Sequence, residues 1–179
     1  MKAYEMTIAG LTRALPLCPI AEDLYIGAFI IFGDVEMTVA AAGELLKKAP
    51  EFDILVTSEA KSIPLIHEMA RQCGKPYIVA RKAPKLYMRN VVFTHVKSIT
   101  TAAEQMLCLG SDEIEKIKGK KVLIVDDVIS TGESLNAVMK LVEQFDANVV
   151  AKAAILAEGD AADRDDIIFL EKLPLFFHD

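Results

Sequence analysis

The 179-residue sequence predicts an α/β protein with a mainly parallel, twisted sheet flanked by helices. Short apolar runs of strand length alternate with segments of helical periodicity, which is the order found in sheets of that kind. The runs are nearly continuous in apolar residues, as expected of strands that are buried on both faces. Apolar residues make up 53% of the chain, so a disordered or low-complexity protein is excluded. We expect a single domain over residues 1–179.

The first predicted elements form one strand–helix–strand unit. Residues 36–48 have a helical pattern, and residues 53–57 (DILVT) predict a buried strand. Ser62 is expected to begin a helix that Gly74 ends, and residues 77–80 predict the next strand. A helix that joins two parallel strands in this way forms a right-handed crossover in nearly all known folds.

The same order repeats in the second half of the chain. Residues 121–126 (KVLIVD) predict a strand, and a helix with one apolar face is expected to begin near Gly132. Residues 148–157 and 167–170 are the last two predicted strands. Residues 82–103, between the two units, have weak periodicity. An irregular segment of that length inside a compact domain predicts a functional lid or a mobile loop.

Composition and charge limit the classes of function. The chain has 20 basic and 26 acidic residues, and this acidic balance argues against a general nucleic-acid binder. The first ten residues lack the apolar core of a signal peptide, and the apolar run 24–33 is shorter than the roughly 20 residues of a membrane helix. We expect a cytoplasmic protein without a membrane span. The three cysteines are widely separated, which predicts neither a disulfide framework nor a zinc site.

Residues 122–134 (VLIVDDVISTGES) carry the strongest chemical signal. An apolar strand ends in Asp126 and Asp127 and continues through hydroxyl residues and Gly132 into a helix. Ligands of parallel α/β sheets bind beyond the carboxyl ends of the strands. Backbone N–H groups of residues 129–133 and the neighbouring hydroxyl groups can surround a phosphate, while the two carboxylates can accept hydrogen bonds from sugar hydroxyls or hold a hydrated Mg²⁺. A phosphorylated sugar needs both.

The residues of this segment also fit two other interpretations. Ser, Thr and Asp are favoured at helix caps for structural reasons alone, so the segment could be an ordinary buried strand with a capped helix. A strand that ends in two acids also occurs as the magnesium-binding segment of nucleotide-hydrolysing proteins. Those proteins carry a glycine loop, G-x-x-x-x-G-K-[ST], which this sequence lacks, so we do not expect an ATPase.

Residues 126–132 (DDVISTG) resemble the phosphoribosyl pyrophosphate (PRPP) motif of type I phosphoribosyltransferases. Three further segments are similar to the adenine branch of that family. Residues 57–62 (TSEAKS) stand where it has its pyrophosphate loop, and residues 81–86 (RKAPKL) match its Arg-Lys-x-x-Lys-Leu segment. Residues 31–35 (IFGDV) match its Phe-Arg-Asp-Ile segment, whose aromatic ring packs on the purine. The resemblance implies a single-domain fold of that type with a small hood and a mobile lid loop.

The resemblance also implies an activity, which is the transfer of a 5-phosphoribosyl group from Mg²⁺-bound PRPP to a purine nitrogen with release of pyrophosphate. Such an enzyme is a pentosyltransferase of purine salvage, and a homodimer is expected. The implied catalytic residues are Asp126, Asp127 and Glu104, of which the two aspartates would also hold Mg²⁺, directly or through water. PRPP and its 5-phosphate would be bound by Ile129, Ser130, Thr131, Gly132, Glu133 and Ser134. Pyrophosphate would be bound by Glu59, Ala60, Lys61, Ser62, Arg81, Lys82 and Lys85, and the base by Phe32, Val35 and Ser130.

Several positions depart from the family pattern and leave alternatives open. Lys61 and Ser62 replace an Arg-Gly pair, and Gly33 replaces an arginine. These changes are compatible with a non-catalytic regulator that binds PRPP or a nucleotide. At the position of Ser130, adenine enzymes of the family have a small residue and enzymes for 6-oxopurines often have an acid, so the resemblance favours adenine. Gly159, in contrast, replaces a bulky residue of the family's purine pocket. Hypoxanthine, guanine and xanthine therefore remain alternative bases.

Overall fold

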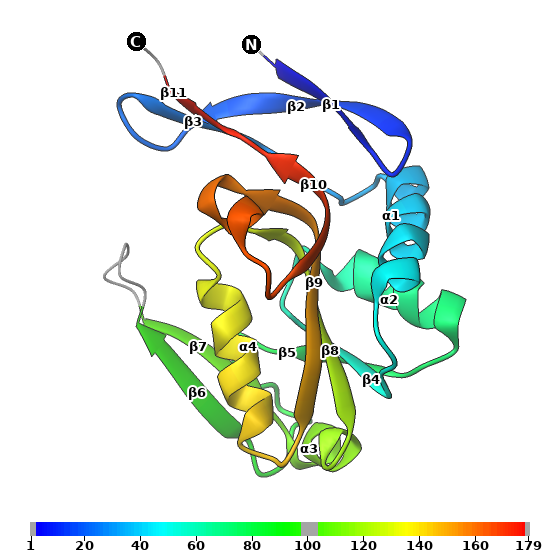
Figure 1. The fold of residues 1–179 in the computed structure, drawn as a ribbon. Helices are drawn as coiled ribbons and strands as arrows, with labels where there is room; N and C mark the ends of the chain where they lie inside the picture. The colour runs from blue at the N-terminus through cyan, green and yellow to red at the C-terminus, as the bar shows by residue number, and fades with distance from the viewer. Residues whose placement is uncertain (1–2, 98–103, 178–179) are drawn as a thin grey trace.

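The computed structural model describes residues 3–97 and 104–177, and its centre is a five-stranded sheet (Figure 1). All neighbouring strands of this sheet are parallel, and their order is β10-β9-β8-β4-β5. The strands are β4 (Ile54–Ser58), β5 (Tyr77–Ala80), β8 (Lys121–Ile129), β9 (Asn148–Glu158) and β10 (Ile168–Leu173). The predicted α/β class with a parallel sheet is confirmed.

Helices cover both faces of the central sheet. The helices are α1 (Val35–Lys48), α2 (Ile63–Cys73), α3 (Ser111–Ile117) and α4 (Glu133–Glu143), with a short 3₁₀ helix η1 (Gly159–Asp163). Leu123 and Val125 of β8 pack into a core cluster with α1 and α2. Val122 and Ile124 point to the opposite face and pack with α4. Because successive side chains of one strand enter two separate cores, the apolar run of β8 is continuous.

The strand predicted at residues 121–126 is three residues longer in the structure. β8 continues through Ile129, because its pairing with β9 extends to Ile129 opposite Ala157. Asp126 and Asp127 therefore lie within the strand, and the turn begins at Ser130. Gly132 then adopts a left-handed conformation (φ 79°) directly before α4.

A second sheet forms a hood over one end of the molecule (Figure 1). Its antiparallel order is β1-β2-β3-β11, and it joins the first segment of the chain to the last. Its strands are β1 (Ala3–Ile8), β2 (Leu11–Pro19), β3 (Leu24–Gly27) and β11 (Leu175–Phe177). The apolar run 24–33 thus contributes β3 and the connection to the core, where Phe29 and Ile31 are buried. Among the described helices, none is long and apolar enough to cross a membrane.

The expectation of an irregular segment at residues 82–103 is wrong in part. Val92–Lys97 form β6, which pairs antiparallel with β7 (Glu104–Leu109). The β6 sequence, VFTHVK, does not alternate regularly between apolar and polar residues and so gave no strand signal. Gln144, the C-cap residue of α4, donates a hydrogen bond of 3.1 Å from its Nε2 to Thr94 Oγ1. The hairpin is thereby attached to the core, while residues 98–103 lie outside the described part.

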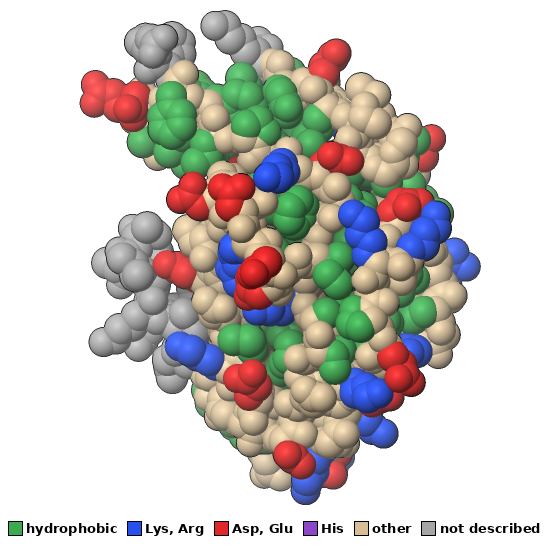
Figure 2. All heavy atoms as spheres, in the orientation of Figure 1, with side chains coloured by type: hydrophobic (Ala, Val, Ile, Leu, Met, Phe, Trp, Pro, Cys, Tyr) green, Lys and Arg blue, Asp and Glu red, His purple; other side chains and the backbone are tan. Residues whose placement is uncertain are grey.

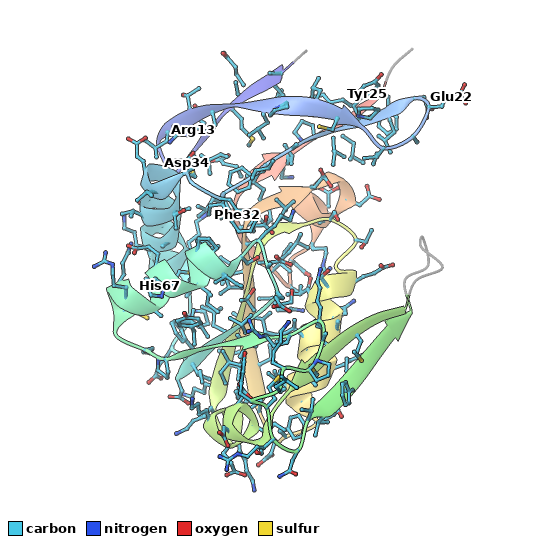
Figure 3. The ribbon with its side chains drawn as sticks, turned by 180° about the vertical axis from the view of Figure 1, so that it is seen from behind. Arg13, Glu22, Tyr25, Phe32, Asp34 and His67 are labelled. Carbon is cyan, nitrogen blue, oxygen red and sulfur yellow. The ribbon has the colours of Figure 1, made fainter. Side chains whose placement is uncertain are left out.

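Asp34 connects the hood to the first helix of the core. Its carboxylate accepts the backbone N–H of Met37 at 3.1 Å and so caps α1. The same carboxylate accepts hydrogen bonds of 2.6 and 3.0 Å from the guanidinium of Arg13 in β2. Figure 3 shows the two side chains together where the hood meets α1. The hydrogen bond from Arg13 and the cap hold the pKa of Asp34 below its usual value, against the opposing effect of burial.

We predict that Asp34→Ala lowers the free energy of unfolding by about 1–2 kcal/mol at pH 7, because a helix cap and a charged hydrogen bond are lost. A carboxylate with a depressed pKa stabilises the fold above its unfolded pKa, and this stabilisation is lost as the pH falls through the folded pKa. Urea unfolding should therefore show the difference between the proteins shrinking below about pH 4. Glu44→Ala, which removes an exposed ion pair with Lys47, is the control. An equal loss in both variants, or a loss independent of pH, would contradict the prediction.

Candidate active site

The candidate site lies where the strand order of the central sheet reverses. β5 follows β4 on one side, whereas β8 and β9 lie on the other side of β4. In open α/β sheets, the crevice at such a reversal lies outside the carboxyl ends of the strands and is the usual place for ligands. A cavity of about 380 Å³ occupies it. The cavity is lined by Ser58, Glu59, Ala60, Lys61, Ser62, Lys82, Leu107, Asp126, Asp127, Val128, Ser130 and Ser134.

Ser62 links the loop after β4 to both aspartates of β8. Its hydroxyl donates to Asp126 Oδ1 at 2.6 Å and accepts the backbone N–H of Asp127 at 2.9 Å. The N–H of Asp127 also approaches Asp126 Oδ1 at 2.9 Å. Ser62 occupies the N-cap position of α2, yet its side chain makes no capping hydrogen bond. Its hydroxyl instead holds the carboxyl ends of β4 and β8 together.

The two carboxylates are incompletely neutralised. Asp127 is buried, with 2% of its surface exposed, and its Oδ2 has no hydrogen-bond partner among the described residues. The nearest charge recorded for that oxygen is Lys61 Nζ at 3.4 Å. Burial raises the pKa of Asp126 to about 7, the hydrogen bond from Ser62 opposes this rise, and the charge of Asp127 adds to it. The pair can therefore accept further hydrogen bonds or a cation.

Mg²⁺ fits this donor set. Magnesium is usually held by one or two carboxylates together with water and substrate oxygens rather than by a cage made of protein alone. The described residues contain no group of three or more His, Cys, Asp or Glu side chains that could hold a metal ion. The buried Oδ2 of Asp127, which accepts no hydrogen bond from the described residues, is the observation that favours a cation or a hydroxyl donor at this point.

The turn after β8 forms a second, smaller pocket of about 40 Å³. Its lining contains all six residues predicted to bind the 5-phosphate, which are Ile129, Ser130, Thr131, Gly132, Glu133 and Ser134. The side chain of Ile129 is buried in the core, so its backbone alone can serve a ligand. The turn leads into the eleven-residue helix α4, whose first N–H groups and dipole favour an anion.

The predicted pyrophosphate residues separate into two groups. Glu59, Ala60, Lys61, Ser62 and Lys82 line the main cavity, whereas Arg81 and Lys85 are absent from its lining. The guanidinium of Arg81 lies 3.3 Å from Glu59 and donates a 2.7 Å hydrogen bond to the hydroxyl of Tyr87. Glu59 also accepts the backbone N–H of Lys82 at 2.9 Å. These contacts fasten the loop after β4 to the loop after β5.

Of the three predicted base-binding residues, Ser130 lines the main cavity, whereas Phe32 and Val35 do not. Phe32 is 53% exposed and lies in the segment between the hood and the core (Figure 3). Val35 is 72% exposed and lines a different cavity of about 200 Å³, between α1 and α2. Glu104 is the first residue of β7, and its side chain lies outside the described part of the chain.

Sequence reasoning gave no role to two residues of this region. Glu158 ends β9 beside the end of β8, burial raises its pKa, and the charge of Lys61 opposes that rise. Thr57 is fully buried and donates a 2.6 Å hydrogen bond to the carbonyl of Val125, which joins β4 to β8 just below the cavity. The sequence indicated that Glu158 lies at the end of a strand. That its carboxyl group lies close enough to feel the charge of Lys61 depends on the strand order.

Comparison with known proteins identifies the family. The family model of the phosphoribosyl transferase domain matches residues 37–174, which include the central sheet and the turn after β8. An adenine phosphoribosyltransferase of Thermotoga sp. (strain RQ2) is 37% identical over 106 residues, and the match spans 59% of each protein. An adenine phosphoribosyltransferase of Clostridium acetobutylicum is 32% identical over 130 residues, covering 73% of this chain and 72% of that protein.

The fold agrees with this assignment. The crystal structure of an adenine phosphoribosyltransferase from Thermoanaerobacter pseudethanolicus superimposes with a TM-score of 0.73 at 21% identity, covering 88% of this chain and 95% of that one. At that identity the likeness concerns the fold alone. The family match covers most of the chain and contains the strands and turn that form the site. The chain belongs to the phosphoribosyltransferase family, has its type I fold and resembles its adenine branch.

Proposed function

We propose that the protein is a purine phosphoribosyltransferase that converts adenine and Mg²⁺-bound PRPP to the nucleoside monophosphate and pyrophosphate in purine salvage. The observation that carries the proposal is the Asp126–Asp127 pair, which lies between the turn after β8 and the loop after β4 that carries Lys61. We further propose that residues 1–179 act as one domain, in a cytoplasmic homodimer.

The chemistry assigns a task to each part of the cavity. Carbon-1 of the ribose becomes cation-like as pyrophosphate leaves, so catalysis needs a fixed sugar and nearby negative charge. Asp126 and Asp127 would accept hydrogen bonds from the ribose hydroxyls, and the turn at residues 130–134 would hold the 5-phosphate. Lys61 and Lys82, on the other wall of the cavity, would face the pyrophosphate. Mg²⁺, when bound, supplies positive charge that stabilises the leaving group.

The choice of adenine is supported by Ser130 and by the relatives. Ser130 lines the cavity and offers no carboxylate to a 6-oxopurine. The relatives named above are adenine enzymes, which favours an enzyme over a regulator that only binds PRPP. Phe32, an exposed aromatic residue between hood and core, remains the proposed stacking partner of the base. Glu104 remains a proposed acid–base residue.

A panel of bases tests the proposed function directly. The protein is incubated with PRPP, Mg²⁺ and either adenine, hypoxanthine, guanine or xanthine, and pyrophosphate release is measured. We expect the highest kcat/KM with adenine. A higher value with another purine would reassign the base. Calorimetric binding of PRPP without turnover on any base would contradict an enzyme and support the regulator.

Asp127→Asn should lower kcat by about 10²–10³-fold, because it removes a fixed negative charge beside the developing cation. The amide has nearly the same shape, so circular dichroism and the unfolding midpoint should indicate a folded protein. Asp112 of α3 forms an exposed ion pair with Arg89. Asp112→Asn removes this pair, is the matched control and should keep its activity. Turnover by Asp127→Asn within threefold of the wild type would rule out the proposed ribose contact.

The raised pKa of Asp126 predicts pH-dependent binding. Below about pH 7 the free protein holds a proton on Asp126, and ligand binding that requires the charged carboxylate must release it. The affinity for Mg²⁺-PRPP should therefore increase from pH 6 to pH 8. Titration calorimetry at pH 6.5, in buffers of different ionisation enthalpy, measures the protons released. With Asp126→Asn, only protons from the ligand's own ionisable groups can be released, so this variant should release fewer protons than the wild type. Equal proton release by both proteins would contradict the prediction.

A further inference from the structure

Arg164 lies directly against Gly132 in the turn after β8, and it is not among the residues that line the small pocket there. It follows η1 as the C-cap residue, far from the turn in sequence. A Cβ atom added at Gly132 would lie only 2.5 Å from Nη1 of Arg164. The guanidinium therefore occupies the space that any other residue at position 132 would fill. Gly132 thus serves both the left-handed start of α4 and the close approach of a cation.

The orientation of this guanidinium is fixed from its other side. Nε and Nη2 of Arg164 each donate a 2.8 Å hydrogen bond to the carboxylate of Asp166. Asp166 also accepts a hydrogen bond from Lys152 of β9. The pKa of Asp166 is held well below its usual value, first by the hydrogen bond from Arg164 and then by that from Lys152. Arg164 is 28% exposed and is anchored by a bidentate pair that favours a single geometry.

The anchored side chain keeps one donor for another partner. Nη1 makes no hydrogen bond to any described residue, although its two sister nitrogens are both bonded. Lys152, Asp166 and Arg164 together carry a net charge of +1. A cation at Gly132 adds to the positive end of α4.

We propose that Arg164 is a phosphate-positioning residue, which braces the Gly132 turn and strengthens binding of the phosphate monoester of the ribose ligand. The inference rests on the proposed function, because it assigns the 5-phosphate to this turn. It adds a cationic residue, held by Asp166 and Lys152, to a site whose predicted phosphate ligands included no cation.

Two probes that bind opposite ends of the cavity test this role. Titration calorimetry measures the affinity for ribose 5-phosphate and, separately, for magnesium pyrophosphate. Arg164→Met should weaken the binding of ribose 5-phosphate about tenfold or more, because the Gly132 turn loses its brace and a nearby positive charge. Its affinity for magnesium pyrophosphate should stay within twofold of the wild type. Arg164→Lys, which keeps the charge but loses the bidentate geometry, should recover part of the loss.

Arg71→Met is the matched control, because Arg71 forms a bidentate pair with Glu68 on α2. It should leave both affinities unchanged. Unchanged ribose 5-phosphate binding in Arg164→Met, or equal loss of both probes, would overturn the inference. No binding of ribose 5-phosphate to the wild type would overturn it as well. Wild-type protein that binds ribose 5-phosphate with the predicted Arg164 dependence, but turns over no purine, would reject the proposed function and leave the role of Arg164 standing.

Discussion

Asp126 and Asp127 bring two negative charges to the end of a strand that is otherwise buried in the core. The hydroxyl of Ser62 and the ammonium group of Lys61 reduce the cost of this arrangement, but Oδ2 of Asp127 is left without a hydrogen-bond partner in the described part of the chain. Burial favours the protonated form of Asp126, so its pKa rises to about 7. Such incomplete compensation costs stability in the free protein. It is the arrangement expected of a site that is completed by a ligand with hydroxyl groups or a cation.

The strand order converts this local pair into a cavity with two ends. Because β4 and β8 are neighbours, Ser62 reaches an acid 64 residues away along the chain, and the loop that carries Lys61 faces the turn after β8. The next strands, β9 and β10, are joined by the segment that brings Arg164 against Gly132 of that turn. The face drawn in Figure 2 mixes side chains of both charges, and hydrophobic side chains gather over the hood and also lower on the face.

Local signals in the sequence were sufficient for the elements of the central sheet. The apolar run of β8 and the glycine after α2 have direct physical meaning, since a buried strand must be apolar and a left-handed C-cap favours glycine. The hood hairpin β1–β2 and strand β6 were missed, because they lack the continuous apolar runs that marked the buried parallel strands. The motif identified both aspartates and the turn, but the contacts of Ser62 and Arg164 depend on which strands are neighbours. Position 32 shows the reverse case, since a family pattern predicted a base contact and the side chain lies outside the main cavity.

The account depends on one claim, which is that the aspartate pair and the turn after β8 bind two parts of the same phosphorylated sugar. A crystal structure of the protein with Mg²⁺ and PRPP tests it most directly. We expect the ribose hydroxyls within hydrogen-bonding distance of Asp126 and Asp127, and the 5-phosphate surrounded by the N–H groups of residues 130–134. Lys61 should then have left Asp127 for the pyrophosphate. A ribose without contact to either aspartate, or a 5-phosphate bound away from the turn, would contradict the account.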